Sequence, residues 1–318
     1  SKLSSNSLGP AGWDQIGGDI DGEAYDNFSG SGVSLSASGR ILAIGANYNS
    51  DGGIGAGQVR VYIYNESKTT ANSLGPAGWD KLGGDIDGEY AGDESGGGHW
   101  NNRSIELSAD GTIIAIGAFG NDGNGRDSGH VRVYKYNPSK STAQTNQSLA
   151  GFGPIGWDRL GDDIDGEAID DYSGFNVSLS ADGTIVSIGA WANNGNGVDA
   201  GHVRVYRYTP SKTVAVTNQS DPSFGPIGWI RLGGDLDGEA VGDRCCTNAL
   251  SADGTIIAIG AGFNNNYTGN VRVYRYNSSK TTANSLGPIG WDQIGGDIDG
   301  EAINNFSGDS ISISADGT

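Results

Sequence analysis

Five acidic segments contain the residues of this 318-residue chain that are best suited to chemistry. Each segment follows a tryptophan and places two aspartates and a glutamate at alternating positions, as in Asp-Ile-Asp-Gly-Glu. Hard oxygen donors spaced in this way around a glycine suit calcium. The alternative is that each aspartate accepts hydrogen bonds from the backbone of its own turn. The candidate metal ligands are Asp19, Asp21, Glu23, Asp85, Asp87, Glu89, Asp163, Asp165, Glu167, Asp235, Asp237, Glu239, Asp297, Asp299 and Glu301.

Paired carboxylates also perform glycoside hydrolysis, but their repetition argues against that use in this chain. A catalytic pair should be unique, whereas this chain carries five near-identical copies. The three histidines, His99, His130 and His202, form no catalytic pattern, and no nucleophile or phosphate-binding motif is present. We therefore expect a protein that is not an enzyme.

Asn-x-Ser/Thr acceptors for N-linked glycans are about twice as frequent as chance would give in a chain of this composition. They favour a secreted or cell-surface glycoprotein carrying N-linked glycans. One of them, Asn176, falls inside an expected strand and is the weakest candidate. The acceptors are Asn27, Asn65, Asn102, Asn146, Asn176, Asn218, Asn266, Asn277 and Asn305.

The only two cysteines, Cys245 and Cys246, are adjacent. Oxidising surroundings would favour a strained disulfide between them. The alternatives are two free buried thiols, or bridges to another chain. Zinc is excluded because this pair lacks further ligands nearby.

A tryptophan recurs at one position of every repeat, which is typical of packing between units. Stacking on sugars is the alternative use of such a residue. Trp100 and Trp191 lie outside the repeated position, so they are the candidate ligand-binding residues if the protein binds carbohydrate.

The repeated tryptophans are 66, 78, 72 and 62 residues apart, which indicates a repeat architecture. In the third unit, alternating apolar residues predict strands near 175–179 and 202–208, with a two-sided apolar strand at 185–190 between them. A fourth short strand begins at Trp229. Four antiparallel strands in sequence are typical of a β-propeller blade. A stacked β-solenoid is the alternative, although its repeats are usually shorter.

The predicted fold is therefore all-β, a propeller of four-stranded antiparallel blades that form a single repeat domain over residues 1–318. Four complete repeats are expected, with a partial blade at each end. The complete units span 31–89, 103–167, 174–239 and 246–301, and the partial ones span 1–30 and 302–318.

Segments of the third unit resemble FG-GAP repeats, notably Ser173-Gly-Phe-Asn-Val-Ser-Leu-Ser and Gly201-His-Val-Arg-Val-Tyr. Similar repeats occur in large surface proteins of aquatic bacteria and microalgae. The resemblance implies an integrin-α-like propeller outside the cell. The family's calcium loop is reduced here to Ser180-Ala-Asp-Gly-Thr184, so that metal site is not expected.

The two ends of the chain do not match. The chain begins with a fourth strand near Trp13 and ends after a first strand at 310–314. The blade that these strands would share lacks its two middle strands. We therefore expect either a piece of a longer array or completion by a neighbouring molecule. A head-to-tail contact that does not close produces a filament.

The formal charge of −19 disfavours nucleic acid and anionic membranes as partners. The sequence contains no run of 18 apolar residues that would indicate insertion into a membrane. The predicted function is an extracellular structural glycoprotein, a subunit of a surface filament whose partners are copies of itself. The alternative is an adhesin or lectin-like module that binds cell-surface glycans.

Overall fold

The computed structural model describes residues 4, 6, 7, 9–97 and 103–318. Four separate antiparallel sheets follow one another along the chain, and each is one blade. Blade 1 contains β1 (Ser29–Leu35), β2 (Ile41–Ala46), β3 (Gln58–Tyr64), β4 (Trp79–Lys81) and β5 (Ile86–Asp87). Blade 2 contains β6 (Ile105–Leu107), β7 (Ile113–Ala118), β8 (His130–Tyr136), β9 (Trp157–Arg159) and β10 (Ile164–Asp165).

Blades 3 and 4 repeat the same order. Blade 3 contains β11 (Ser173–Leu179), β12 (Ile185–Ala190), β13 (His202–Tyr208), β14 (Trp229–Arg231) and β15 (Leu236–Asp237). Blade 4 contains β16 (Thr247–Leu250), β17 (Ile256–Ala261), β18 (Asn270–Tyr276), β19 (Trp291–Gln293) and β20 (Ile298–Asp299). The short helix α1 (Asn264–Tyr267) lies between β17 and β18. Within the described residues, no helix is long and apolar enough to span a membrane.

The four predicted strands of each blade are confirmed, and the structure adds a fifth that the sequence analysis did not include. This extra two-residue strand lies within the acidic segment and pairs with the start of the third strand. In blade 3, Leu236 pairs with Val203 and Asp237 pairs with His202. This pairing makes Leu236–Asp237 part of the sheet, and Leu236 is buried between the two aspartates of its segment.

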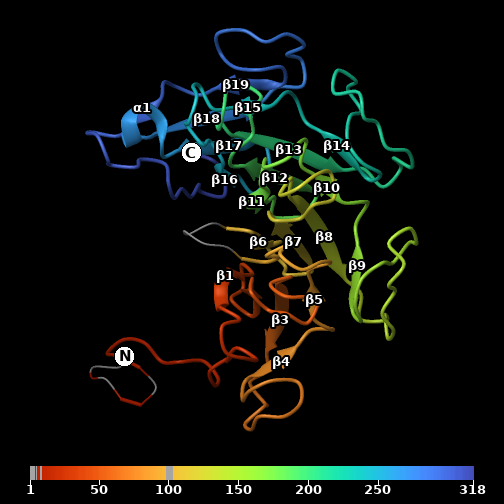
Figure 1. Ribbon diagram of the computed structural model, residues 1–318. Helices are drawn as coiled ribbons and strands as arrows, with labels where there is room; N and C mark the ends of the chain where they lie inside the picture. The colour runs from red at the N-terminus through yellow and green to blue at the C-terminus, as the bar shows by residue number, and fades with distance from the viewer. Residues whose placement is uncertain (1–3, 5, 8, 98–102) are drawn as a thin grey trace.

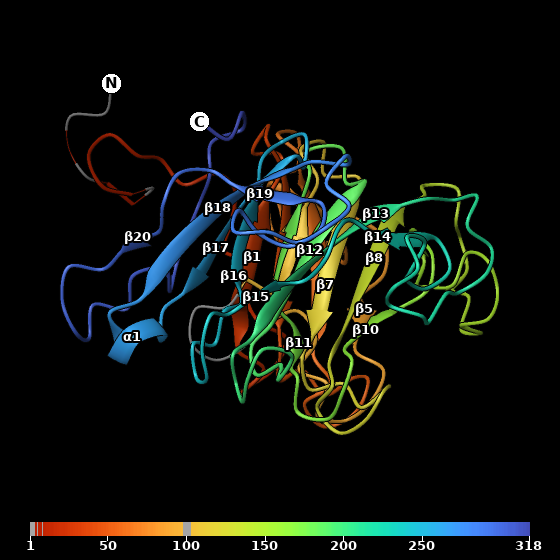
Figure 2. The ribbon, with the colours of Figure 1, turned by 90° about the horizontal axis from the view of Figure 1, so that it is seen from above.

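The blades fan out around a common axis, with β1, β6, β11 and β16 innermost (Figure 1). Figure 2 shows the same fan from above. A chain of backbone hydrogen bonds links the hairpin turns that follow these inner strands. The amide of Ala37 donates to the carbonyl of Ala109, and the same bond continues through Ala181 and Ala252 to Ala315, at 2.7–2.9 Å. Each blade is thus fixed in register with the next.

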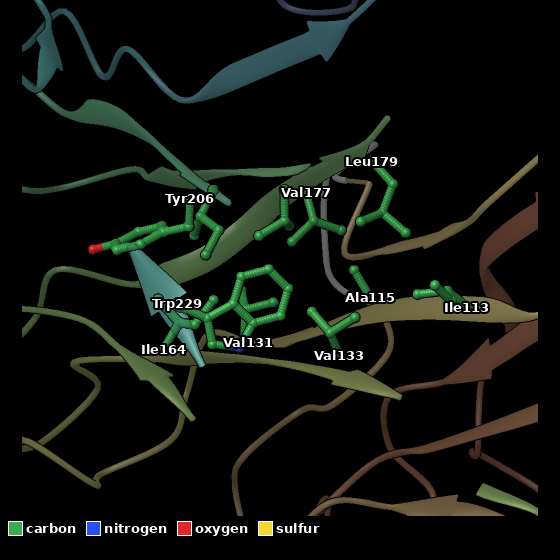
Figure 3. Packing of buried hydrophobic residues seen from close by; sticks show 11 residues of the cluster. Ile113, Ala115, Val131, Val133, Ile164, Val177, Leu179, Tyr206 and Trp229 are labelled. Carbon is green, nitrogen blue, oxygen red and sulfur yellow. The ribbon is translucent and has the colours of Figure 1, made fainter. Parts of the chain in front are cut away.

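Hydrophobic cores lie between neighbouring blades. Figure 3 shows the core between blades 2 and 3, where Val131 and Ile164 of blade 2 meet Val177, Tyr206 and Trp229 of blade 3. Equivalent clusters separate blades 1 and 2 and blades 3 and 4. A blade in this architecture buries its apolar faces only against its neighbours.

The array is an open one, since blades 1 and 4 lie at its two ends and the segments that precede blade 1 and follow blade 4 lie on the open side (Figure 1). Residues 13–20 precede blade 1, and residues 310–314 follow blade 4. Neither segment belongs to a four-stranded sheet. Each of the end blades therefore has one apolar face that no complete blade covers.

Candidate functional sites at the blade junctions

A tryptophan connects the blades at every junction. The indole Nε1 of Trp157 donates to the carbonyl of Leu82 at 3.0 Å, and that of Trp229 donates to Leu160 at 2.9 Å. Trp79 and Trp291 make the equivalent bonds to Ile16 and Leu232, at 3.1 and 2.9 Å. Four of the five repeated tryptophans therefore pack between units, as the sequence favoured, and Trp13 is exposed.

A glycine makes room for each of these indoles. A Cβ at Gly161 would lie 2.7 Å from Trp229 Nε1 and 2.6 Å from the carbonyl oxygen of Ile227. Gly17, Gly83 and Gly233 are equally close to the indoles of their junctions. Gly295 occupies the same repeat position in blade 4, and a Cβ there would meet nothing within 4 Å. No further blade therefore covers the surface of blade 4 around Gly295.

An arginine on the third strand of each blade reaches back to the glutamate of the preceding acidic segment. Arg132 pairs with Glu89, and Arg204 pairs with Glu167 at 2.5 Å. The corresponding pairs of Arg60 with Glu23 and Arg272 with Glu239 are longer, at 3.6 and 3.8 Å. The sequence analysis missed these arginines. Their signal is a charged residue recurring in an otherwise apolar strand, because a buried charge requires a partner.

Two of these arginines also bind the first aspartate of their own blade through two hydrogen bonds. Arg204 donates to Asp235 at 2.8 and 2.7 Å, and Arg132 donates to Asp163 at 2.9 and 2.6 Å. Burial alone would raise the pKa of Asp235, but the hydrogen bonds and charge of Arg204 lower it to about 2. The pKa of Asp163 is lowered by the same combination with Arg132.

The pKa of the second aspartate in the same two acidic segments is raised rather than lowered. Burial, followed by the negative charge of the first aspartate, raises the pKa of both Asp165 and Asp237 to about 6. The two histidines that begin the third strands of blades 2 and 3 are neutral near pH 7. Burial and the adjacent arginine lower the pKa of His130 to about 3 and that of His202 to about 4.

Two clusters could in principle hold a metal: Glu89, His130 and Asp163, and the equivalent Glu167, His202 and Asp235. In each cluster the carboxylates already bind one guanidinium, that of Arg132 or Arg204. A calcium ion would therefore compete with an arginine for the same oxygens. Calcium binding by the acidic segments stays a prediction.

The acidic segments nearer the ends have fewer partners. Asp19 accepts a hydrogen bond from Gln15, Asp85 accepts from Lys81, and Asp87 accepts from Gln58. In the last segment, Asp297 accepts from Gln293, whereas Asp299 and Glu301 are exposed. The backbone carbonyl of Asp21 accepts from Arg60. The five segments therefore share a sequence but not an environment.

The glycan acceptors differ in accessibility. Asn146, Asn218, Asn266 and Asn305 are exposed. Asn27, Asn65 and Asn277 are half-buried, and the last two donate to Asp80 and Asp292 respectively. Asn102 lies outside the described residues.

Asn176 requires a correction. It is 3% exposed within β11, and its side-chain oxygen accepts from the amide of Asn248. The folded protein has no room for a glycan at this position.

The expected disulfide between Cys245 and Cys246 is also corrected, since both thiols are free and buried. Successive residues of an extended chain point to opposite sides. Cys245 accordingly packs in the core between blades 3 and 4, while Cys246 lines a pocket on the other side. Burial raises the pKa of Cys245 to about 11 and that of Cys246 well above its usual value, which leaves both thiols unreactive at neutral pH.

Of the two tryptophans outside the repeated position, Trp100 lies outside the described residues. Trp191 is half-buried and stacks on Phe175, with ring centroids 6.0 Å apart. It lines a pocket between blades 3 and 4 together with Arg244, Phe263 and Phe306.

Comparison with known proteins finds similar solved structures at low sequence identity. No family model and no curated protein matches the sequence. The periplasmic gluconolactonase of Pseudomonas aeruginosa is similar at 14% identity with a TM-score of 0.43, over 87% of this chain and 59% of that chain. TolB from Acinetobacter baumannii is similar at 13% identity with a TM-score of 0.36, over 81% of this chain and 43% of that chain.

The β-propeller domain of the Trilobed protease from Pyrococcus furiosus is a third similar structure. It is 9% identical with a TM-score of 0.35, over 84% of this chain and 55% of that chain. This chain spans less than two thirds of each of the three structures. The likeness is one of fold, and no family model supports the resemblance to FG-GAP repeats.

Proposed function

We propose that this chain is a structural subunit that assembles head to tail through the open faces of its end blades. The observation that carries the proposal is the exposure of positions that are buried at every internal junction. Ile298 is 59% exposed, whereas the equivalent Ile164 of blade 2 is 2% exposed. At the other end Val33 is 64% exposed, whereas the equivalent Ile105 is 3% exposed.

The two faces complement one another because they are the two sides of one repeated junction. Blade 4 presents Gly295, the carbonyl of Ile294 and the carboxylate of Glu301, which are the acceptor side. Blade 1 presents Trp79 and Arg60, which are the donor side. A second copy docked in register would place its Trp79 on Gly295 and its Arg60 beside Glu301, and its β1 would replace residues 307–315, which lie in the equivalent place against blade 4.

Residues 13–24 occupy the donor side within the same chain. Trp79 donates to Ile16, the amide of Gly18 donates to Ala77, and Arg60 lies beside Glu23. Residues 12–24 are identical in sequence to residues 290–302. The end of blade 4 can therefore replace this segment with the same side chains. When a second copy docks, the end of its blade 4 replaces residues 13–24 of the first copy against blade 1.

The contact joins two different faces, so it propagates unless its rotation closes a ring. We propose the propagating form, a filament built of continuous blades. The exposed Asn-x-Ser/Thr acceptors and the resemblance to FG-GAP surface proteins support an extracellular, glycosylated filament. We propose a structural rather than an enzymatic role, because Asp163, Glu167 and Asp235 at the internal junctions are engaged with arginines.

The test uses one substitution at two positions with the same local sequence. Gly17→Ala places a Cβ 2.7 Å from Trp79 Nε1 and should release the internal cover, which increases the associated fraction. Gly295→Ala meets nothing in the single copy and should block docking. Gly92→Ala is the control, since its φ of +88° imposes similar backbone strain away from both faces.

The measurement is mass by light scattering over a concentration series. Association that rises with Gly17→Ala, falls with Gly295→Ala and is unchanged by Gly92→Ala is the expected pattern. Equal association of the Gly17 and Gly295 variants would refute docking through these faces.

A further inference from the structure

Aromatic side chains form a belt whose members range from half-buried to exposed, with Phe28 57% exposed and Phe306 39% exposed. The belt consists of the aromatic residues that follow the second strand of a blade or precede its first strand. Its ring contacts include Phe28 with Tyr48 at 5.3 Å and Tyr172 with Trp191 at 5.8 Å. At the C-terminal end Phe263 contacts Phe306 at 5.7 Å.

Between blades 3 and 4 the belt opens into a pocket of about 560 Å³. This volume is within the range of small-molecule sites. Its aromatic walls are Phe175, Trp191, Phe263 and Phe306, and its polar groups include Arg244 and Asp309.

Arg244 distinguishes this junction from the others. The same repeat position holds Phe28, Glu94, Tyr172 and Phe306 elsewhere, so this is the only cation among the five. Its guanidinium carbon lies 4.2 Å from the ring centroid of Trp191 and 4.9 Å from that of Phe263. Its carboxylate neighbour, Asp199, is 3.8 Å away, which is an ion pair beyond hydrogen-bond distance.

The guanidinium is therefore held by ring faces while its N–H groups remain available to a ligand. A guanidinium offers five such donors in a planar fork. Asp309 supplies an exposed carboxylate acceptor in the same pocket. The pocket thus combines apolar ring surfaces with both a donor and an acceptor.

This combination selects one class of ligand. A wholly apolar molecule would leave the arginine and the aspartate without partners as it displaced their water. A simple anion would face Asp309 and Asp199, and a simple cation would face Arg244. A neutral sugar ring has an apolar C–H face for the aromatic walls and hydroxyls that both donate and accept.

We propose that the pocket between blades 3 and 4 binds a neutral sugar ring of a glycan. The argument for this site does not rest on the proposed assembly, although Phe306 and Asp309 belong to the segment that follows blade 4, beside its open face. Phe306, the most exposed of its aromatic residues, provides the ring on which the sugar stacks. Arg244 and Asp309 bind its hydroxyls.

The experiment is titration of the full chain with methyl glycosides of neutral hexoses, followed by NMR and calorimetry. Arg244→Gln and Asp309→Asn should each weaken binding at least tenfold, and Phe306→Ala should do the same by removing the stacking surface. Arg275→Gln is the matched control, since it removes an exposed arginine from β18 of the same blade. Gly295→Ala should bind sugar as the unaltered chain does, which separates this site from assembly.

Failure of the folded chain to bind any neutral glycoside would overturn the proposal. So would binding that Arg244→Gln and Asp309→Asn leave unchanged. Stronger binding of benzoate or tetramethylammonium than of any glycoside would assign the pocket to an anion or a cation instead.

Discussion

The internal junctions and the two end faces are built from the same repeated sequence, yet they differ in almost every physical property. Trp157 is fully buried at the junction of blades 1 and 2, whereas Trp13 is 76% exposed at the N-terminal end. The difference cannot arise from the local sequence, because residues 12–24 and 290–302 are identical to each other and closely match the internal copies. It arises from the presence or absence of neighbouring blades. In this architecture, stability belongs to the contact between repeats rather than to the repeat itself.

The largest contrast is expected from glycine substitution. Gly161→Ala should destabilise the fold by about 4 kcal/mol, because its Cβ collides with Trp229 and with backbone and because its positive φ adds strain. Gly295→Ala has nearly the same φ and open space around it, so about 1 kcal/mol is expected. Urea unfolding of both variants measures the difference. Equal losses would mean that backbone strain, rather than junction packing, explains these glycines.

The ion pairs provide the second contrast. Asp235→Asn leaves the buried Arg204 without its bidentate partner and should cost about 3 kcal/mol. Asp297→Asn, at the equivalent position of the open end, should change stability by less than about 0.5 kcal/mol. Chemical denaturation at pH 7 tests both. A large effect at Asp297 would show that its surroundings are not open.

The indoles provide a third and smaller contrast. Trp229→Phe removes the hydrogen bond to Leu160 and part of a buried ring, which should cost about 2 kcal/mol. Trp13→Phe should change stability by no more than about 0.5 kcal/mol in the single copy, since the side chain is exposed. Thermal unfolding of the two variants at low protein concentration distinguishes them. Similar losses at both positions would argue against a special role of the junction.

The smallest contrast depends on pH. Asp237 has a folded pKa of about 6, above its ordinary value of 3.8. Because the pKa of this carboxyl is higher in the folded chain than in the unfolded chain, its protonated form stabilises the fold. This stabilisation is fully present below pH 3.8 and is lost as the pH rises through about 6. Asp237→Asn should therefore raise the melting temperature at pH 8 and have little effect at pH 4. A melting temperature that Asp237→Asn leaves unchanged at pH 8 would contradict this expectation.

Much of the fold could be predicted from the sequence because each strand carries its own pattern. Alternating residues at 175–179 and the Asp-Gly turn at 182–183 indicate a hairpin without any tertiary information. The fifth strand was not predicted, because two residues such as Leu236–Asp237 are too few to show a period. Its pairing depends on the neighbouring strand β13.

The candidate site was harder to predict than the fold. The sequence singled out the carboxylates of the acidic segments, but their main partners, such as Arg132 and Arg204, are distant in the chain. Local spacing could suggest a metal loop and could not reveal that a guanidinium occupies it. The adjacency of Cys245 and Cys246 was similarly misleading, since backbone direction places their side chains on opposite sides. Trp191 was identified by its place outside the repeat, but the pocket around it requires residues from two blades and from the segment that follows them.

Electron microscopy of the concentrated protein tests most directly whether the end faces are unfinished junctions. We predict unbranched filaments in which blade 4 of one copy is followed by blade 1 of the next, in the register of the internal junctions. Gly295→Ala should abolish these filaments without unfolding the subunit. Single four-bladed particles at every concentration, or symmetric pairs that join like faces, would contradict the account.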